Sequence, residues 1–313
     1  ASDGAAVDLF GGSVSVSGDV AVVGASSDND NGGFFSGSAY VFRWNGSTWA
    51  EEQKLLPSDG TRFNHYFGWS VSVSGDVAVV GTLTDDDACP SDPLCGSGSA
   101  YVFRWNGSEW LQEGKLLAWD GDEGDAFGAV VFVSGDVAVV GASGSAAAYV
   151  FRWNGSTWQE EQKLVASNGT WADHFGNAVS VSGGVAVVGA AGDDNNGRQS
   201  GSAYVFRWNG SEWAGEQKLL ASDGATFDHF GGSVSVSGDV AIVGTATDSD
   251  NGFQSGSGKY KKNYPIWEVL DFAARHGFEG VELVADWPQG GYPAAVQKER
   301  VLALRRLYDL YGL

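Results

Sequence analysis

Three features of the sequence predict an all-β fold made of repeated four-stranded sheets, a β-propeller. A single pattern recurs in register, with copies that begin at Phe10, Phe67, Phe127, Phe175 and Phe230. The apolar residues within each copy follow strand periodicity, and the 47 glycines suit short strands joined by tight turns. Self-similarity of this kind dictates the architecture. Four copies are complete and the fifth stops near Gly258, so we expect four full blades and a partial fifth.

Each copy predicts four strands. In the first copy, residues 13–17 alternate serine and valine and predict a strand with one buried face. Residues 20–24 are apolar throughout, which predicts a strand buried on both faces. Residues 39–44 predict a third, aromatic strand, and the more polar residues 48–56 predict an outer edge strand. Small residues inside and large ones outside favour a radial arrangement of blades, with a stacked solenoid as the alternative.

The turn between the third and fourth strands carries an Asn-Gly pair in each complete copy. Asn45-Gly46 predicts a two-residue type I′ hairpin, because both residues tolerate positive φ. The following serine also makes each asparagine an N-glycosylation sequon, which a eukaryotic secretory pathway could use. The sequons are at Asn45, Asn106, Asn154 and Asn209, with a further one at Asn168. Turn formation is the alternative reason for these asparagines. Arg43 and its copies are expected to pair with glutamates of the fourth strand, such as Glu51 or Glu52.

The Phe-Gly at the start of the first strand and the Val-Val-Gly-Ala at the end of the second resemble the FG-GAP repeat, the blade of integrin α-subunit propellers and of many bacterial secreted proteins. Phe10-Gly11 and Val23-Gly24-Ala25 carry the resemblance first, and it covers residues 1–258. It implies a secreted or cell-surface binding module. The integrin-type blade holds calcium in a D-x-D-x-D-G loop between strands 1 and 2. Here that hairpin is only Ser-Gly-Asp or Ser-Gly-Gly, so the family's calcium ligands do not transfer.

The family usually closes with seven blades, and this chain has four and a half. The chain is therefore a fragment of a larger ring, closes unusually small, or is completed by partners, including further copies of itself.

Acidic residues gather in the loops between the second and third strands and in the connectors between copies. In an up-and-down blade these segments lie on one face, which would be dense in the oxygen ligands that Ca²⁺ prefers. The candidate ligands are Asp28, Asp30, Asp85, Asp87, Asp193, Asp194, Asp248 and Asp250. The alternative is turn chemistry, because Asp, Asn and Gly also reverse strands. The third copy supports that alternative, since its loop at residues 141–148 has no acid.

Histidines and tryptophans mark the connectors. His65, His174 and His229 lie one or two residues before the repeat phenylalanine. Together with Trp69, Trp119 and Trp171 they could line shallow sugar-binding pockets between blades, as in a lectin. No activated serine or cysteine accompanies them, so we expect no enzyme, and a structural role for the histidines is the alternative.

Net charge limits the classes of partner, and the cysteines indicate the redox environment in which the protein folds. Of the net charge of −21, residues 1–258 carry −22 and residues 259–313 carry +1, so the repeat region should repel nucleic acid and anionic lipid. No apolar run approaches the roughly 20 residues of a membrane helix, so we expect no direct membrane insertion. Cys89 and Cys95 lie in one loop and predict a disulfide formed in an oxidising compartment, with free thiols as the alternative.

The tail at residues 259–313 departs from the repeat. Residues 266–277 and 294–312 have helical spacing, and residues 278–286 read as a short buried strand. This α/β tail, through residues 273–283, resembles the N-terminal part of a xylose-isomerase-like TIM barrel. It covers about 50 residues of a fold that needs about 250. That family's metal ligands come mostly from later strands, so no catalytic role follows. We expect the tail to cover the open edge of the last blade or to be poorly ordered.

The sequence therefore predicts an extracellular or cell-surface adhesion module that recognises a protein or glycan through its acidic loop face, with Ca²⁺ as a candidate cofactor. Three alternatives stay open: a structural surface or filament scaffold, a lectin-like sugar binder, and a sugar-isomerase fragment carried by the tail.

Overall fold

The computed structural model describes residues 1–245, apart from positions 6, 30–32, 60–64 and 89–94. The chain divides into two compact units, Ala1–Asp250 and Asn251–Leu313. The second unit lies outside the described residues, and so do the predicted tail elements. The fold below is that of the first unit.

The described residues form short strands and one helical turn. The strands are β1 Phe10–Ser17, β2 Val20–Ala25, β3 Ser38–Trp44, β4 Trp49–Leu55, β5 Ser70–Ser74, β6 Val77–Thr82, β7 Ser99–Trp105, β8 Trp110–Leu116, β9 Phe127–Ser134, β10 Val137–Ala142, β11 Ala147–Trp153, β12 Trp158–Val165, β13 Phe175–Ser182, β14 Val185–Ala190, β15 Ser202–Trp208, β16 Trp213–Leu219, β17 Phe230–Ser237 and β18 Val240–Thr245. The helical turn is the 3₁₀ segment η1, Trp171–Asp173.

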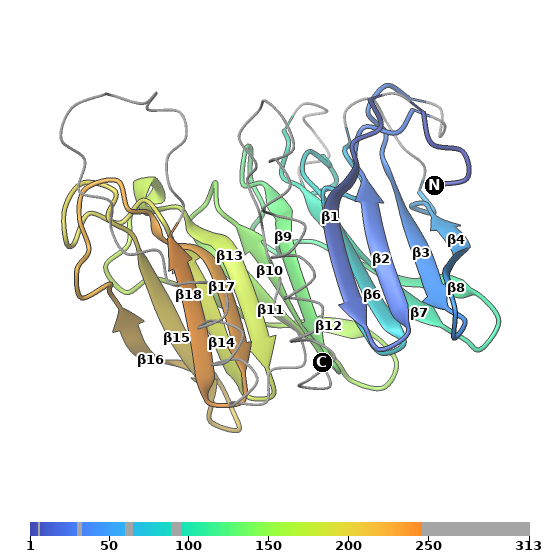
Figure 1. The fold of residues 1–313 in the computed structure, drawn as a ribbon. Coiled ribbons are helices and arrows are strands. Elements are labelled where there is room, and N and C mark those ends of the chain that lie inside the picture. The colour runs from blue at the N-terminus through green and yellow to red at the C-terminus, as the bar shows by residue number, and fades with distance from the viewer. Residues whose placement is uncertain (6, 30–32, 60–64, 89–94, 246–313) are drawn as a thin grey trace, which may run out of the picture. The chain divides into compact units, whose positions relative to one another are not determined.

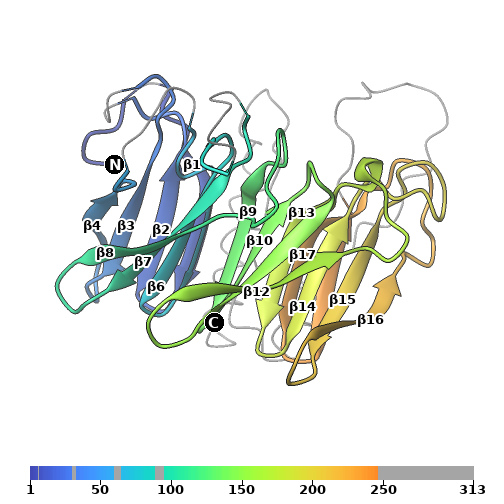
Figure 2. The same ribbon diagram turned by 180° about the vertical axis from the view of Figure 1, so that it is seen from behind.

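These strands make antiparallel sheets in sequence order, which we call blades 1 to 5 (Figure 1). Blade 1 is β1–β4, blade 2 is β5–β8, blade 3 is β9–β12 and blade 4 is β13–β16. Blade 5 is the pair β17–β18 within the described residues. Each inner strand contacts the inner strand of the next blade, and the outer strands β8, β12 and β16 are seen best from behind (Figure 2). The predicted all-β propeller fold of repeated four-stranded blades is confirmed, and the first two strands of the fifth copy lie within the described residues.

The core lies in layers between consecutive blades. On one face of blade 2, Val71 and Val73 of β5 pack against Val22 and Val41 of blade 1. On its other face, residues of β6 and β7 pack against Phe127 and the inner valines of blade 3. The second strands β6, β10 and β14 are therefore buried on both sides, as their uninterrupted apolar sequence predicts, whereas β2 and β18 at the two ends of the array are only partly buried. Each hydrophobic cluster therefore combines residues of two consecutive blades.

Serine hydroxyls join the inner strands. The backbone N–H groups of Val71, Val73 and Gly75 point away from their own sheet and donate to Ser13, Ser15 and Ser17 Oγ of blade 1, at 2.9, 3.0 and 3.0 Å. The same ladder recurs from blade 2 to blade 3 and from blade 4 to blade 5. An inner strand would otherwise present an edge of unsatisfied donors. The serine face of the alternating strand is thus a contact surface for the next blade.

The repeated Phe-Gly and Val-Val-Gly motifs meet at a close backbone contact. A Cβ built on Gly81, at the end of β6, would lie 2.0 Å from the carbonyl oxygen of Gly128 in blade 3. Gly128 itself has φ of 88°, a conformation that favours glycine. The motif therefore marks the point where consecutive blades approach too closely for any side chain.

The hairpin between the third and fourth strands differs from the predicted two-residue turn. Trp44 pairs with Trp49, so four residues form the loop. Gly46 has positive φ, whereas Asn45 does not. The Asn45 side chain instead accepts hydrogen bonds from the backbone N–H groups of Ser47 and Thr48, each at 3.0 Å. The type I′ prediction was wrong because the asparagine stabilises the loop through its side chain rather than through its backbone conformation.

Candidate binding face

The loops and connectors of the blades form one face, which we call the connector face. It comprises the loops between the second and third strands (residues 26–37, 83–98, 143–146 and 191–201) and the connectors between blades (residues 56–69, 117–126, 166–174 and 220–229), as far as these are described. Backbone hydrogen bonds tie the two sets together, for example from Tyr66 N to Phe35 O at 2.9 Å and from Gly192 N to Asp173 O at 3.0 Å. Its segments lie at the upper ends of the blades in Figure 1.

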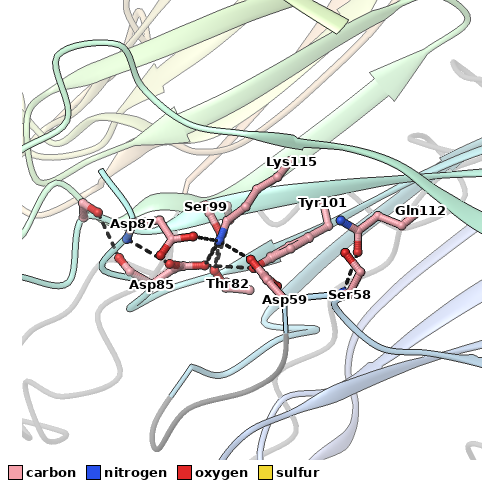
Figure 3. A network of polar contacts seen from close by, with 10 residues as sticks. Ser58, Asp59, Thr82, Asp85, Asp87, Ser99, Tyr101, Gln112 and Lys115 are labelled. Carbon is pink, nitrogen blue, oxygen red and sulfur yellow. Dashed lines mark hydrogen bonds and ion pairs between the residues drawn. The ribbon is translucent and has the colours of Figure 1, made fainter. Parts of the chain in front are cut away.

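A buried lysine–aspartate network lies beneath this face in blade 2 (Figure 3). The Lys115 ammonium lies 2.8 Å from Asp85 and 2.7 Å from Asp59, and it also contacts Asp87. The Tyr101 hydroxyl lies 3.0 Å from carboxylate oxygens of both Asp59 and Asp85. The network links the loop after β6, strands β7 and β8, and the connector that enters the blade.

The network recurs in the other complete blades with local changes. In blade 1, Lys54 lies 2.8 Å from Asp28 and 2.7 Å from Asp3. In blade 4, Lys218 contacts Asp193, and Asn168 takes the place of the connector aspartate. Blade 3 has no acid in its short loop, and there Lys163 pairs with the connector residue Asp120 at 2.7 Å.

The aspartates and lysines of the network are charged at neutral pH. Burial raises the pKa of the Asp85 carboxyl, but hydrogen bonding and attraction to Lys115 outweigh this effect and leave the pKa below its ordinary value. Burial lowers the pKa of the Lys115 ammonium, and the hydrogen bonds to its three carboxylates outweigh that, so the pKa is raised. Burial raises the pKa of the Tyr149 hydroxyl in blade 3 to about 12, although its hydrogen bond with Lys163 acts in the opposite direction. Each lysine therefore stays charged beside its aspartates.

The predicted calcium ligands fall into three groups. Asp28, Asp85 and Asp193 are buried and paired to lysines. Asp87 and Asp194 are exposed, and Asp194 accepts a hydrogen bond from the Gln199 N–H at 2.7 Å. Asp30, Asp248 and Asp250 lie outside the described residues. Within the described part of the chain, Asp59, Asp85 and Asp87 are the one group of three carboxylates close enough together to hold a metal ion.

Calcium binding at these acids stays a prediction. In blade 2 a calcium ion would compete with the Lys115 ammonium, which already contacts all three carboxylates of the group. A divalent cation in the same place would bring a second positive centre within a few ångströms of the ammonium. The donor set therefore fits a lysine better than it fits a lysine and a metal together.

The aspartate two residues before the repeat phenylalanine has a structural role in most connectors. Asp125 accepts a hydrogen bond from Asp122 N at 2.9 Å, and Asp173 accepts one from Thr170 N at 2.9 Å. These carboxylates close the turn that leads into the inner strand. Asp8 and Asp228 do the same at their own connectors. His65 occupies the equivalent position in blade 2, where it is buried.

The predicted sugar-binding residues lie on three different connectors. His65 and Trp69 lie on the connector into blade 2, Trp171 and His174 on the one into blade 4, and His229 on the one into blade 5. His174 and Trp171 are exposed, whereas the His229 ring lies 3.2 Å from Ala191 O. The described structure does not bring these residues into one pocket. Each connector presents its own small set.

Exposed aromatic side chains are the most prominent apolar feature of the connector face. Trp119 is 76% exposed, Trp171 is 75% exposed and Trp69 is 42% exposed. Tyr66 stacks on Phe35, with ring centroids 5.6 Å apart, and meets Trp69 edge-on at 6.1 Å. This aromatic cluster joins the loop of blade 1 to the connector into blade 2.

The remaining predicted sites are the disulfide, the sequon asparagines and the arginine–glutamate pairs. Cys95 is buried and disulfide-bonded, and Cys89 lies outside the described residues. The sequon asparagines Asn45, Asn106, Asn154, Asn168 and Asn209 are all exposed. In the hairpins of all four complete blades, the asparagine side chain accepts a hydrogen bond from a backbone N–H of the same turn. The turn itself therefore accounts for the Asn-Gly-Ser pattern. The predicted arginine pairing is present, with Arg43 Nε 2.6 Å from Glu52 Oε1.

Sequence reasoning missed the tyrosine and lysine of the buried network. A signal for them exists: every complete copy has Ala-Tyr in its third strand and Lys-Leu in its fourth. Tyr101 lies directly opposite Lys115 across the β7–β8 pair, and the same register holds for Tyr40 and Lys54. A tyrosine and a lysine recurring at cross-strand positions indicate a shared acidic partner.

Comparison with known proteins supports the repeat assignment. The model of the FG-GAP repeat matches residues 1–42, 49–103, 110–151, 158–206 and 213–258, more than half of the chain. No curated protein matches the chain. The described residues include no helix whose length and hydrophobicity would suit a membrane span.

Proposed function

The chain belongs to the FG-GAP repeat family, and we propose that it is an extracellular, non-enzymatic binding module whose connector face recognises glycans. FG-GAP repeats occur in integrin-like extracellular and adhesion proteins, and the family is generally non-enzymatic. The single observation that carries the proposal is the set of exposed tryptophans on the connectors. Trp119 and Trp171 each leave about three quarters of their side chain in solvent.

Isolated tryptophans at such exposure are suited to carbohydrate ligands. A tryptophan offers a broad apolar surface with a polar N–H, and its ring packs against the C–H face of a sugar. Carboxylates nearby can accept hydrogen bonds from sugar hydroxyls. Asp122 follows Trp119 closely in sequence, and Asp173 ends the helical turn that Trp171 begins. An exposed tryptophan with an aspartate two or three residues later thus recurs on two connectors.

Charge narrows the ligand class further. A net charge of −21 disfavours polyanionic ligands such as sulfated glycans, because like charges repel over a Debye length. A neutral or basic glycan is therefore the expected class. Several weak sites spaced on successive blades would gain affinity for a repetitive surface through multivalency.

An extracellular location agrees with the disulfide at Cys95, since disulfides persist in oxidising compartments. The family's occurrence in extracellular proteins points the same way. The expected partner is a glycan-bearing surface outside the cell.

The test is a screen of the whole chain against immobilised neutral, basic and acidic glycans, repeated with Trp119→Ala and Trp171→Ala. We expect binding to neutral glycans that falls at least about tenfold in each variant, which corresponds to about 1.4 kcal/mol. Trp44→Ala is the matched control, because Trp44 is exposed on a hairpin at the opposite ends of the strands and should leave binding unchanged. Equal binding by all three variants would overturn the proposal. Capture of a protein through the same two tryptophans would retain the binding module but reject the glycan.

A further inference from the structure

The outer face of blade 1 exposes residues that every other complete blade buries. Val14 is 46% exposed and Val16 is 62% exposed, whereas their counterparts Val71 and Val73 in blade 2 are each 6% exposed. Phe10, the first residue of β1, is also exposed, although Phe67, Phe127 and Phe175 are fully buried. In blades 2 to 4 this face is covered by the preceding blade. The face of blade 1 therefore has the chemistry of an interior contact.

The third and fourth strands of blade 1 also expose side chains that are covered in blade 2. In blade 2, Trp110 is 2% exposed because blade 1 covers it: its N–H donates to Gln53 Oε1 at 2.7 Å, and its indole Nε1 donates to Glu52 at 3.0 Å. Arg43 of blade 1 also lies over the ring of Trp105, 4.8 Å from its centroid. The counterparts in blade 1, Trp44 and Trp49, are 41% and 44% exposed.

The last described blade presents the surface that would match this face. Residues 230–241 of β17 and β18 have the same sequence as residues 10–21 of β1 and β2. In β1, Ser13 and Ser15 accept the backbone N–H groups of the next blade. In β17, the equivalent residues Ser233 and Ser235 are exposed. A row of hydroxyl acceptors thus stands at one end of the array and a row of strand N–H donors at the other.

We propose that this chain associates with itself head to tail, so that the outer face of blade 1 in one copy packs on the β17–β18 pair of a second copy. The contact would repeat the geometry seen between consecutive blades: Val14 and Val16 become buried, and the Val14 and Val16 N–H groups donate to Ser233 and Ser235 of the other copy. The two surfaces differ, so the contact is heterologous and can continue into rings or filaments. This inference does not depend on glycan binding.

The proposal commits to a second copy because the fit is that of blade to blade. Every junction between described blades packs two valines of the later blade's inner strand into a hydrophobic cluster, and the junctions between blades 1 and 2, 2 and 3, and 4 and 5 add a serine ladder. The valines of β1 and the serines of β17 supply both features at the two ends. An unrelated partner would need to reproduce a row of hydroxyls at strand spacing. The serine ladder between blades 4 and 5, from Val236 N to Ser180 Oγ at 3.1 Å, shows that β17 itself was docked by the same geometry.

The test is sedimentation or light scattering of the whole chain over a wide range of concentration. We expect association that increases with concentration. Val16→Asp should abolish it by placing a charge in the contact, and Ser235→Asp should abolish it from the other side, each with a rise in Kd of at least about tenfold. Leu111→Asp is the matched control, because Leu111 is 49% exposed on the outer strand β8, away from both surfaces, and should leave association unchanged. Circular dichroism would confirm that each variant is folded.

Mixing the two variants distinguishes head-to-tail contact from any symmetric contact. Val16→Asp retains an intact β17 surface and Ser235→Asp retains an intact blade 1 face, so their mixture should form dimers and no larger species. A chain that stays monomeric at every concentration overturns the proposal, which is also the outcome expected if residues 246–313 cover the face. Loss of association in Val16→Asp alone would overturn it as well, because that result indicates contact between two blade 1 faces.

Discussion

The Lys115 ammonium lies 2.8 Å from the carboxylate of Asp85, a side chain that is only 1% exposed. The pair joins the last strand of blade 2 to the loop that follows its second strand, and it sits where sequence reasoning placed a metal ion. A protein cation thus neutralises the buried acid within the blade itself.

Lys115→Met should destabilise the fold strongly. Removing one partner of a buried ion pair leaves an uncompensated charge, which costs roughly 3–5 kcal/mol. Urea unfolding followed by tryptophan fluorescence measures the change. Lys163→Met is the matched control: Lys163 also bonds a tyrosine and a connector aspartate, but its blade has no buried loop acid, so the loss should be clearly smaller. Equal losses in the two variants would mean that the buried Asp85 charge is not the cause.

The same pair should shape the dependence of stability on pH. The pKa of Asp85 is lowered from 3.8 in the fold, so its contribution is present above pH 3.8 and is lost as pH falls through the folded value. The pKa of Lys115 is raised above 10.5, so its contribution is present below pH 10.5 and is lost as pH rises through the folded value.

Stability from this pair should therefore be constant between those limits and fall at both extremes. Melting curves of the wild type and of the Asp85→Asn, Lys115→Gln double variant across pH 2–12 would show it. The double variant should have a flatter acid limb. An identical acid limb in both proteins would assign the acid loss to other carboxylates.

A calcium titration decides between the two roles of the loop acids. We expect millimolar Ca²⁺ to leave the melting temperature of the wild type unchanged, because Lys115 competes for the three carboxylates. Lys115→Gln should gain a calcium-dependent rise, since a ligand that binds only the folded state stabilises it. EDTA is the control. A wild-type melting temperature that rises with Ca²⁺ and falls with EDTA would instead support the predicted calcium sites.

Ser72→Ala tests the serine ladder. Its hydroxyl accepts the Val133 N–H at 3.0 Å, and leaving that buried donor unsatisfied should cost about 1–3 kcal/mol. Ser235→Ala is the matched control, because Ser235 has the same place in its strand and is exposed. Hydrogen exchange at Val133 should accelerate in the first variant only. Unchanged exchange there would show that the ladder does not protect the inner strand.

Gly81→Ala tests the contact between blades. Its Cβ would meet the Gly128 carbonyl oxygen at 2.0 Å, and because the neighbour is backbone, a loss of about 3 kcal/mol or more is expected. Gly114→Ala, on the outer strand β8, has open space around the new Cβ and is the control. If both variants melt together, the blades can separate enough to admit a methyl group.

Some structural roles could be read from the sequence and others could not. The five aligned copies of the repeat predicted where strands and turns lie. The period-two pattern within each strand specified which residues share a face. It also placed Arg43 opposite the glutamates of β4. The same pattern could not show that the serine face is a contact, since an alternating strand with one polar face looks the same whether solvent or a neighbouring blade covers it.

The loop acids show the same division. Asp85 and Asp87 were recognisable from the sequence as clustered oxygen ligands, but their cation was not, because Lys115 lies on a different strand and reaches them only when β7 and β8 pair. The tyrosine and lysine are distant in sequence from the acids that bind them.

The sequence by itself determined the repeat, the order of strands within a blade and the position of each turn, because these follow from local periodicity and glycine placement. Only the tertiary structure decided which blade covers which face, which aspartates are neutralised by lysines and which tryptophans remain in solvent. Burial and charge pairing depend on surfaces that meet only after consecutive blades pack, and the local pattern of a single strand carries no record of its neighbour.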